Sequence, residues 1–173
     1  EFLAEGEGVT AVFTITVDDG NGGTATQDVT VILIGSNDVP EISAGDVTGE
    51  ITDGTDLTDS GSISFTAVDL TDRPVATEVT KSVTAKRADG TTNLPLTTEQ
   101  LAAIENAFSI SPAAGNDNDG TINWTYDIDA GDLEFLAEGE VVTAVFTITV
   151  DDGNGGTATQ DVTVTLTGSN DAP

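Results

Sequence analysis

A long internal repeat constrains this chain more than any other feature of its sequence. Residues 1–40 return as residues 134–173 at an offset of 133, and 36 of the 40 positions are identical. The four exchanges are Gly8/Val141, Ile32/Thr165, Ile34/Thr167 and Val39/Ala172. Because a unit of about 130 residues is an ordinary domain size, we predict that residues 41–173 form one complete module. Residues 1–40 are then the C-terminal hairpin and linker of a preceding copy.

Alternation of apolar and polar residues predicts strands in most of the module. The clearest run is 142–150, which is followed by a Gly-rich turn at 151–156 and a return strand at 157–167. Further strands are predicted at 46–52, 62–68, 79–86 and 121–128. Short strands rich in Thr and Val between Gly and Asp turns are typical of a β-sandwich. We therefore predict an all-β sandwich of about seven strands, with the single Trp, Trp124, in its core.

One segment departs from this alternation. Thr97 and Gln100 are spaced as the first and last residues of a capping box. Three apolar residues then recur at helical spacing, namely Leu101, Ile104 and Phe108. We predict a short helix over 98–108 that lies across one edge or end of the sandwich.

The composition excludes several classes of partner and chemistry. The 31 acidic residues outnumber the 4 basic ones and give a net charge of −27, so nucleic acid and anionic membrane surfaces are repelled. The sequence has no Cys, His or Met, which excludes thiolate or imidazole metal sites and Ser-His-Asp or Cys-His catalysis. No apolar run is long enough to span a bilayer. Paired carboxylates leave glycosidase chemistry open in principle, but no cleft is indicated and we predict that the chain is not an enzyme.

Three segments carry a resemblance to a known family. Residues 65–72 (FTAVDLTD), 123–140 and above all 147–173 (TITVDDGNGGTA…GSNDAP) resemble a VCBS repeat. The resemblance implies an immunoglobulin-like and cadherin-like sandwich, strung in arrays in secreted RTX-type adhesins at the bacterial cell surface. It also implies type I export and a role in adhesion or biofilm formation. Two departures stand out: Ala67 occupies a position where related repeats often carry Asp, and the GGxGxD nonapeptide is absent.

The up-and-down order of strands brings distant acidic residues to one junction. The turns after the strands at 62–68 and 142–150 lie at the N-terminal end of module 41–173, facing the corner and linker of the preceding copy. The residues that converge there are Glu5, Glu7, Asn37, Asp38, Asp69, Asp72, Asp151 and Asp152. So many carboxylates repel one another without a counter-ion. Ca²⁺ accepts six to eight oxygen ligands and suits such a cluster better than the strictly octahedral Mg²⁺. We predict at least one interdomain Ca²⁺; the alternative is that these are ordinary Asp/Gly turns.

Other acidic groups have weaker claims. The equivalent residues at the far end of the module have no following module in this sequence, so their site is expected to be half-built; they are Glu138, Glu140, Asn170 and Asp171. The loop 116–120 lacks EF-hand spacing and is interpreted as an acidic loop. A further set before the corner could bind an intradomain ion: Asp127, Asp129 and Asp132.

These expectations combine into a structural function. We predict an extender module whose partners are neighbouring repeats of the same chain, with Ca²⁺ fixing the angle between them; the alternative is a glycan- or protein-binding sandwich. Hairpin 1–40 cannot replace 134–173 within its own module, because eight linker residues reach only about 28 Å. A lone hairpin is marginal in water. We therefore expect it to be poorly ordered or held in a strand-exchanged homodimer.

Overall fold

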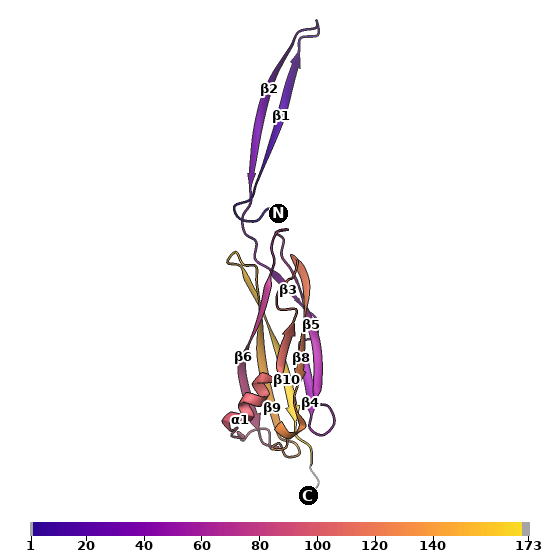
Figure 1. Ribbon diagram of the computed structural model, residues 1–173, viewed down its shortest axis with the longest axis vertical. Helices are drawn as coiled ribbons and strands as arrows, with labels where there is room; N and C mark the ends of the chain where they lie inside the picture. Colours follow the sequence, from indigo (N-terminus) through magenta and orange to yellow (C-terminus); the bar gives the residue numbers. More distant parts are fainter. Residues whose placement is uncertain (1, 171–173) are drawn as a thin grey trace.

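The computed structural model describes residues 2–170 and shows a β-hairpin joined by a linker to a β-sandwich (Figure 1). The hairpin strands are β1 (Gly8–Asp18) and β2 (Thr24–Ile34). The sandwich strands are β3 (Glu41–Ala44), β4 (Thr48–Thr52), β5 (Thr58–Thr66), β6 (Val75–Lys86), β7 (Phe108–Ser111), β8 (Asp119–Asp127), β9 (Val141–Asp151) and β10 (Thr157–Thr167). The helices are α1 (Thr98–Asn106) and the 3₁₀ turn η1 (Ala130–Asp132). No helix among residues 2–170 is long and apolar enough to cross a membrane.

Two four-stranded sheets form the sandwich, which confirms the predicted all-β class. Their strand orders are β4-β10-β9-β6 and β3-β5-β8-β7. The alternation that predicted the strands places every second side chain in the core, as along β9, where Phe146 and Ile148 are fully buried. Trp124 is also fully buried, as predicted, and Phe108 stacks on Phe146 with ring centroids 4.2 Å apart. The inward faces of both sheets therefore share one apolar core.

The first strand is split between the two sheets, which raises the number of sandwich strands from about seven to eight. β3 pairs antiparallel with β5, whereas β4 crosses to the other sheet and pairs parallel with β10. At the crossing the carbonyl of Asp46 accepts a 2.6 Å hydrogen bond from the Trp124 indole. Gly61 lies opposite, where a Cβ atom would stand 2.6 Å from that carbonyl oxygen and 2.7 Å from the Trp124 ring. Only glycine therefore lets the backbone pass this close.

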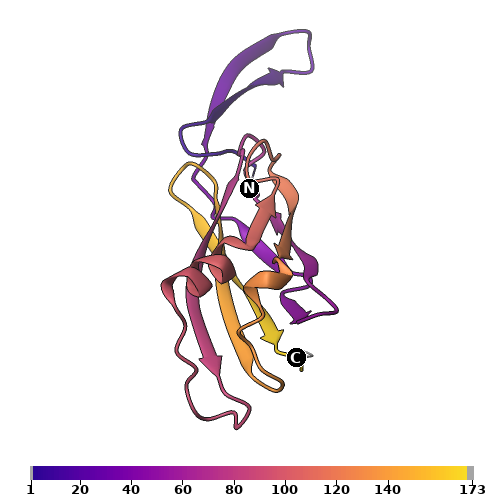
Figure 2. The same cartoon turned by 60° about the horizontal axis from the view of Figure 1, so that its bottom comes forward.

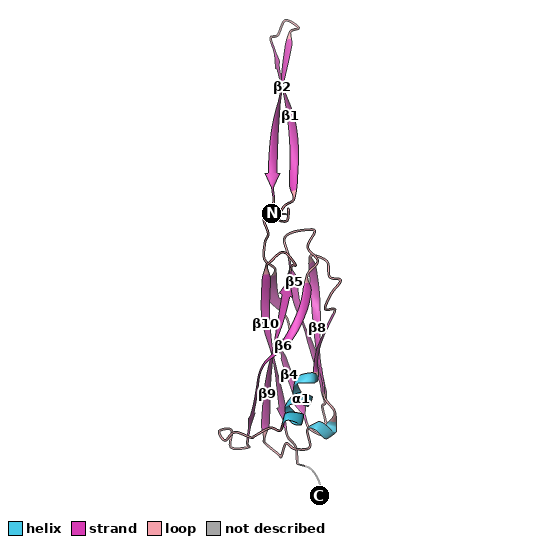
Figure 3. Ribbon diagram, turned by 60° about the vertical axis from the view of Figure 1, so that its left-hand side comes forward, coloured by secondary structure: helices cyan, strands magenta, loops and turns pink. Residues whose placement is uncertain are grey.

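The helix forms where the capping box predicted it but ends earlier. The Thr97 hydroxyl accepts from the Gln100 backbone N–H at 3.2 Å, and the Gln100 side chain accepts from the Thr97 N–H at 2.8 Å. α1 ends at Asn106 instead of residue 108, because Phe108 begins β7 and pairs with β8. Helical and strand conformations both turn Phe108 toward the core, so the apolar spacing alone could not separate them. α1 lies toward the end of the sandwich opposite to the hairpin (Figure 3).

Hairpin β1–β2 is a regular two-stranded sheet that projects beyond the sandwich. Its ladder runs through 11 residue pairs, from Gly8↔Ile34 to Asp18↔Thr24. Both turned views show it clear of the sandwich strands (Figures 2 and 3). No residue of β1 or β2 is fully buried by the described part of the chain. From the sequence we predict that this segment is either poorly ordered or exchanged with another molecule. In the structure the segment has complete strand pairing, and exchange stays a prediction.

Candidate metal centre at the junction of hairpin and sandwich

The linker after β2 runs over the two loops at the near end of the sandwich. The Asn37 side-chain amide donates a 3.0 Å hydrogen bond to Asp152 Oδ2, in the turn between β9 and β10. The Asp38 backbone N–H donates a 3.0 Å hydrogen bond to Asp69 Oδ2, in the loop between β5 and β6. These two contacts join positions 115 and 31 residues apart in the sequence. Hairpin linker and sandwich loops therefore form one polar junction.

The turn between β9 and β10 is built around Asp152. Its Oδ1 atom accepts from the backbone N–H groups of Asn154 at 2.7 Å and Gly156 at 2.9 Å, which closes the turn. Its Oδ2 atom is left for Asn37. Asn154 in turn donates its side-chain amide to Asp72 Oδ1 at 3.0 Å. The turn thus positions one carboxylate directly and a second one through Asn154.

Three carboxylates of this junction are buried despite their charge. Asp69, Asp72 and Asp152 are only 0%, 2% and 3% exposed. Several buried oxygen atoms here have no hydrogen-bond partner among the described residues; they are Asn37 Oδ1, Asp38 Oδ2, Asp69 Oδ1 and Asp72 Oδ2. An unpaired buried carboxylate oxygen is costly, whereas a bound cation would satisfy it. All four atoms are side-chain oxygens, which are the ligands that hard cations prefer.

The charges of the junction act on one another. Burial raises the pKa of Asp72 above its ordinary value of 3.8, and the neighbouring carboxylates of Asp69 and Asp152 raise it further. Burial also raises the pKa of Asp152, but the N–H of Asn154 and the side-chain amide of Asn37 outweigh it, so that pKa lies below the ordinary value. Asp152 is therefore held as a carboxylate, whereas the repulsion among the carboxylates shows in the raised pKa of Asp72.

The predicted ligands divide into those that the structure brings together and those that it does not. Asn37, Asp38, Asp69, Asp72 and Asp152 meet at the junction. Glu7 lies close enough to raise the pKa of Asp72, although its Oε2 atom accepts from the Ala4 N–H at 3.1 Å.

Two predicted ligands stand outside this group. Glu5 is exposed, and the structure gives its side chain no hydrogen bond among the described residues. Asp151 is also exposed and accepts from the Gly153 N–H at 2.8 Å. Asp151 still belongs to the β9 ladder, so it points to the opposite side from Asp152. Among residues 2–170, no group of three acidic side chains is arranged to hold a metal ion.

Three asparagines support the junction and were not among the predicted residues. Asn154 binds Asp72, as described above. Asn116 donates to the Pro74 carbonyl at 3.0 Å, and Asn118 donates to the Ala67 carbonyl at 3.1 Å. The loop interpreted as merely acidic thus holds both ends of the β5–β6 loop that carries Asp69 and Asp72. Their signal in the sequence was the run of Asn and Gly in both turns.

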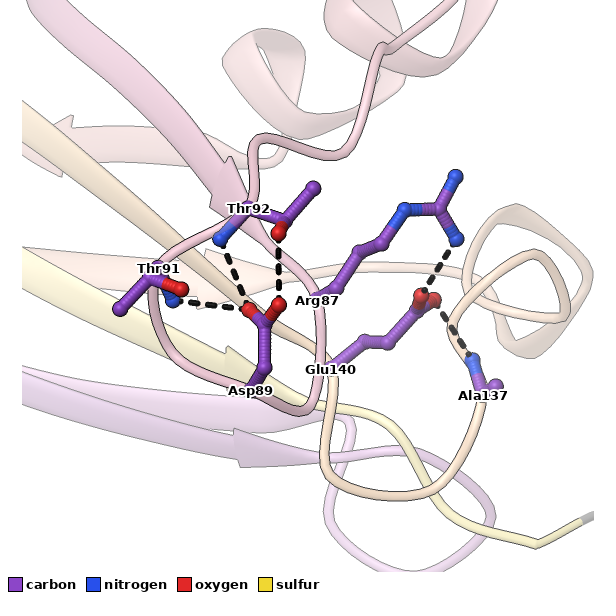
Figure 4. A network of polar contacts seen from close by, with 6 residues as sticks. All are labelled: Arg87, Asp89, Thr91, Thr92, Ala137 and Glu140. Atoms are coloured by element: carbon purple, nitrogen blue, oxygen red, sulfur yellow. Dashed lines mark hydrogen bonds and ion pairs between the residues drawn. The ribbon is translucent and has the colours of Figure 1, made fainter.

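The far end of the sandwich repeats the corner but not the cluster. Glu140 Oε2 accepts from the Ala137 N–H at 3.1 Å, as Glu7 does from Ala4, and Glu140 Oε1 also pairs with Arg87 at 3.5 Å (Figure 4). In the same picture Asp89 accepts from Thr91 and Thr92, and the Thr92 hydroxyl lowers the pKa of Asp89 most. Arg87 therefore supplies a cation of the protein's own at this end.

The remaining predicted ligands gain no geometric support. Glu138 and Asn170 are exposed, and Asp171 lies outside the described residues. Another predicted set lines a shallow hollow beside α1 but is exposed: Asp127, Asp129 and Asp132. The junction is consequently the strongest candidate site in the described part of the chain.

Comparison with known proteins places the chain among bacterial β-sandwiches. The family model described as "Bacterial Ig domain" matches residues 71–165, which is more than half of the chain. No curated protein sequence matches the chain. The solved structures that it resembles include domains 4 and 5 of the S-layer protein SbsC, with 14% identity and a TM-score of 0.38 over 93% of this chain.

Two further structures are similar to the same extent. Protocadherin gamma B2 extracellular cadherin domains 3–6 give 12% identity and a TM-score of 0.45 over 93% of this chain. The sialic acid binding region of a Streptococcus sanguinis adhesin gives 13% identity and a TM-score of 0.41 over 91%. The chain spans 59%, 32% and 37% of these three structures, which is less than two thirds of each.

Proposed function

The chain belongs to the bacterial Ig domain family, and we propose that it is an extender module of a secreted bacterial adhesin, made rigid by Ca²⁺ at the junction between modules. In this proposal residues 41–173 are a VCBS-like repeat, residues 1–40 end the preceding repeat, and the partners are neighbouring repeats of the same chain. The array lies outside the cell, on the bacterial surface, and supports adhesion and biofilm formation. One observation carries the proposal: four buried oxygens without partners come from the linker and from a sandwich loop.

The residues of the junction explain how a module could be held at a fixed angle. Asn37 and Asp38 belong to the linker, whereas Asp69 and Asp72 belong to the sandwich. A bound Ca²⁺ would supply the positive charge that lets their unpaired oxygens stay close together. Without a cation, the carboxylates repel, and among residues 2–170 only two hydrogen bonds tie the linker to the loops. The linker then works as a joint that the cation converts into a fixed angle.

The acidic composition supports the same function. The chain has a net charge of −27, so successive modules repel one another along an array. A divalent cation at each junction attracts the carboxylates of both modules and offsets the repulsion between them. The array would then behave as a stiff rod that holds an adhesive domain away from the cell surface.

The predicted alternative, a glycan-binding sandwich, has less support. Surface aromatic rings are the usual platform for sugars, but the sandwich buries five of its six aromatic residues: Phe65, Phe108, Trp124, Tyr126 and Phe146. The Tyr126 hydroxyl donates inward to the Ile104 carbonyl at 3.1 Å. Its aromatic side chains are therefore used for the core.

Calcium titration of the full chain tests the proposal. We expect Ca²⁺ to raise the melting temperature and to narrow the distribution of hairpin–sandwich angles seen by small-angle scattering. Asp69→Asn with Asp72→Asn should abolish both effects, since the two buried carboxylates are replaced by neutral side chains of the same size. Asp151→Asn is the matched control, because Asp151 is exposed and outside the cluster, and it should respond as the wild type does. Identical melting and scattering in chelator and in millimolar Ca²⁺ would refute the mechanism.

A further inference from the structure

Asp53 is a buried carboxylate that belongs neither to the junction nor to the apolar core. It follows β4 directly and is only 3% exposed. Its backbone N–H donates to the Thr167 carbonyl at 3.0 Å, and its Oδ2 atom accepts from the Ser169 hydroxyl at 3.2 Å. Both partners lie where β10 ends and the chain leaves the sandwich. Asp53 therefore ties the exit of the chain to the end of β4.

A tight turn holds Asp53 in this position. Thr52 and Asp56 exchange backbone hydrogen bonds of 2.8 and 2.9 Å across the turn. Gly54 has a φ of +73°, a left-handed conformation that glycine adopts without strain. The parallel pairing of β4 with β10 brings Thr52 beside Thr167, so the turn and the exit of the chain are neighbours. The backbone therefore places the Asp53 carboxylate, which does not depend on Ser169 for its position.

The two copies of the linker begin in the same way but differ one residue later. The backbone N–H of Gly35 donates to the Glu7 carbonyl at 2.9 Å, and the equivalent bond in the second copy has the same length. The next residue, Ser36, is exposed, whereas its counterpart Ser169 is half-buried and donates to Asp53. The duplicated segment does not include the turn that carries Asp53. Contact with Asp53 thus accounts for the difference between the two serines.

The residues that follow Ser36 are held by the next module. Asn37 and Asp38 donate to the two loops of the sandwich, as described above. Val39 lies against the turn between β9 and β10, where a Cβ atom on Gly156 would stand 3.0 Å from it. Pro40 is buried. Four successive linker residues therefore belong to the module that follows.

We infer that Asp53 anchors the linker where it leaves each module, so that every linker residue is held by one module or the other. The inference rests on the proposed function, in which residues 1–40 end a repeat like 41–173. A copy of Asp53 in that repeat holds Ser36, as Asp53 holds Ser169 here. The next residue, Asn37, is already held by the following module. The joint is thereby confined to the backbone dihedrals around the Ser36–Asn37 peptide bond.

An anchored serine also positions the ligands of the junction. Asn37 and Asp38 follow Ser36 directly and carry two of the buried oxygens that lack partners among residues 2–170. A linker that is fixed before the ion arrives loses less conformational freedom when the ion binds. Asp53 is therefore a positioning residue, which raises the affinity for Ca²⁺ without touching the ion. One hydrogen bond of this kind changes a binding constant by about 2- to 10-fold.

Nitrogen-15 relaxation of the full chain tests the anchor itself. The amides of Ser169 and Asn170 should have order parameters of about 0.85, and Ser169→Ala should lower them to below about 0.6. Ser36→Ala is the matched control, because it makes the same change where Asp53 is not in contact, and it should leave these amides ordered. Asp53→Ala should reproduce the loss, whereas Asp53→Asn keeps an oxygen that accepts the bond and should preserve the order. Mobile amides in the wild type, or unchanged order in Ser169→Ala and Asp53→Ala, would overturn the anchor.

A longer chain tests the effect on calcium binding. A further copy of residues 41–133 before Glu1 completes the first repeat and supplies Ser36 with a copy of Asp53. In this longer chain Ser36→Ala should weaken Ca²⁺ binding by about 2- to 10-fold in calorimetric titrations. The same substitution in the original chain should leave the affinity unchanged.

The outcomes separate this inference from the proposed function. Equal Ca²⁺ affinities of the longer chain and its Ser36→Ala variant would overturn the positioning role and leave the calcium junction standing. If neither chain binds Ca²⁺, the proposed function fails, and the relaxation measurements still decide whether Asp53 anchors the linker.

Discussion

Hairpins β1–β2 and β9–β10 have nearly the same sequence but contrasting surroundings. Phe13 is 58% exposed in the first, whereas its counterpart Phe146 is 1% exposed in the second. Both nevertheless form 11-pair antiparallel ladders with the same register around the same turn. Strand pairing is thus set locally by sequence, while burial depends on whether a second sheet packs against the hairpin, as β7 and β8 do when Phe108 and Tyr126 pack on Phe146.

The local hydrogen bonds of the two hairpins agree closely. The Thr14–Asp28 bond measures 2.7 Å, as does its counterpart between Thr147 and Asp161. The Asp19 carboxylate closes its turn through Asn21 as Asp152 does through Asn154. What the second copy adds are contacts from elsewhere in the chain. Differences in stability between the two hairpins therefore arise from their neighbours and not from the hairpins themselves.

The largest difference should appear in stability. Phe146→Ala is expected to lower the free energy of unfolding by about 3–5 kcal/mol, because it leaves a cavity in the core. Phe13→Ala should change it by less than about 0.5 kcal/mol, since that ring contacts little in the single chain. Urea unfolding at low protein concentration measures both. A comparable loss with Phe13→Ala would mean that the hairpin and sandwich unfold as one unit.

A second difference should appear in the response to calcium. At a free Ca²⁺ concentration of 100 times Kd, the wild type should gain about 2.7 kcal/mol of stability. Asp152→Asn keeps the turn-closing oxygen but loses a charge at the junction, so most of this gain should disappear. Asp19→Asn, at the equivalent turn of the first hairpin, should keep the full gain. Thermal unfolding with Ca²⁺ and with chelator distinguishes the two; equal gains in both variants would exclude Asp152 as part of the site.

The dependence on pH should reveal the buried carboxylates. Because the pKa of Asp72 is raised in the folded chain, Asp72 binds its proton more tightly there than in the unfolded chain. The contribution of Asp72 to the stability of the metal-free protein should therefore fall as pH rises from 3.8 through that raised pKa, by at most about 1.4 kcal/mol per pH unit. Asp72→Asn should remove this decline, which urea titrations across the acidic range would show. An unchanged slope would mean that Asp72 does not carry the repulsion.

The smallest difference concerns the corners before β1 and β9. Glu140 pairs with Arg87, whose side chain is 52% exposed, so solvent screening limits the pair to roughly 0.5–1 kcal/mol. Arg87→Gln should cost about that much at low salt and close to nothing at 1 M salt. Glu7→Gln removes the equivalent carboxylate, which has no such partner and repels Asp72, so it should not lower metal-free stability. Denaturant midpoints at both salt concentrations provide the measurement, and a salt-independent loss in Arg87→Gln would indicate lost packing instead.

Much of the fold could be predicted because its signals are local. Alternation in 142–150 and 157–167 is visible without any partner, and Thr97 with Gln100 marks the start of α1. The end of α1 and the split of the first strand could not be predicted. Phe108 can pack into the core from a strand as well as from a helix, so its apolar side chain does not mark where α1 ends. The crossing near Asp46 depends on Gly61 and Trp124, which are distant in sequence.

The candidate site could be predicted only to the level of its loops. Strand order indicated that Asp69, Asp72 and Asp152 meet the linker, and the structure brings them together. The predicted strand order did not indicate that Asp151 points away from the site, because a single residue decides where the β9 ladder ends. The supporting role of Asn154 depends on side-chain contacts that no sequence spacing encodes.

The parallel pairing of β4 with β10 determines how the sandwich responds when its two ends are pulled apart. The linker enters at one end and the chain leaves at the other, and Thr48–Thr52 runs alongside Thr163–Thr167 in the same direction (Figure 1). Tension therefore drives these two strands past each other in shear, and their evenly spaced hydrogen bonds share the load instead of unzipping one at a time. Strands β4 and β10 thus form a mechanical clamp along the pulling axis.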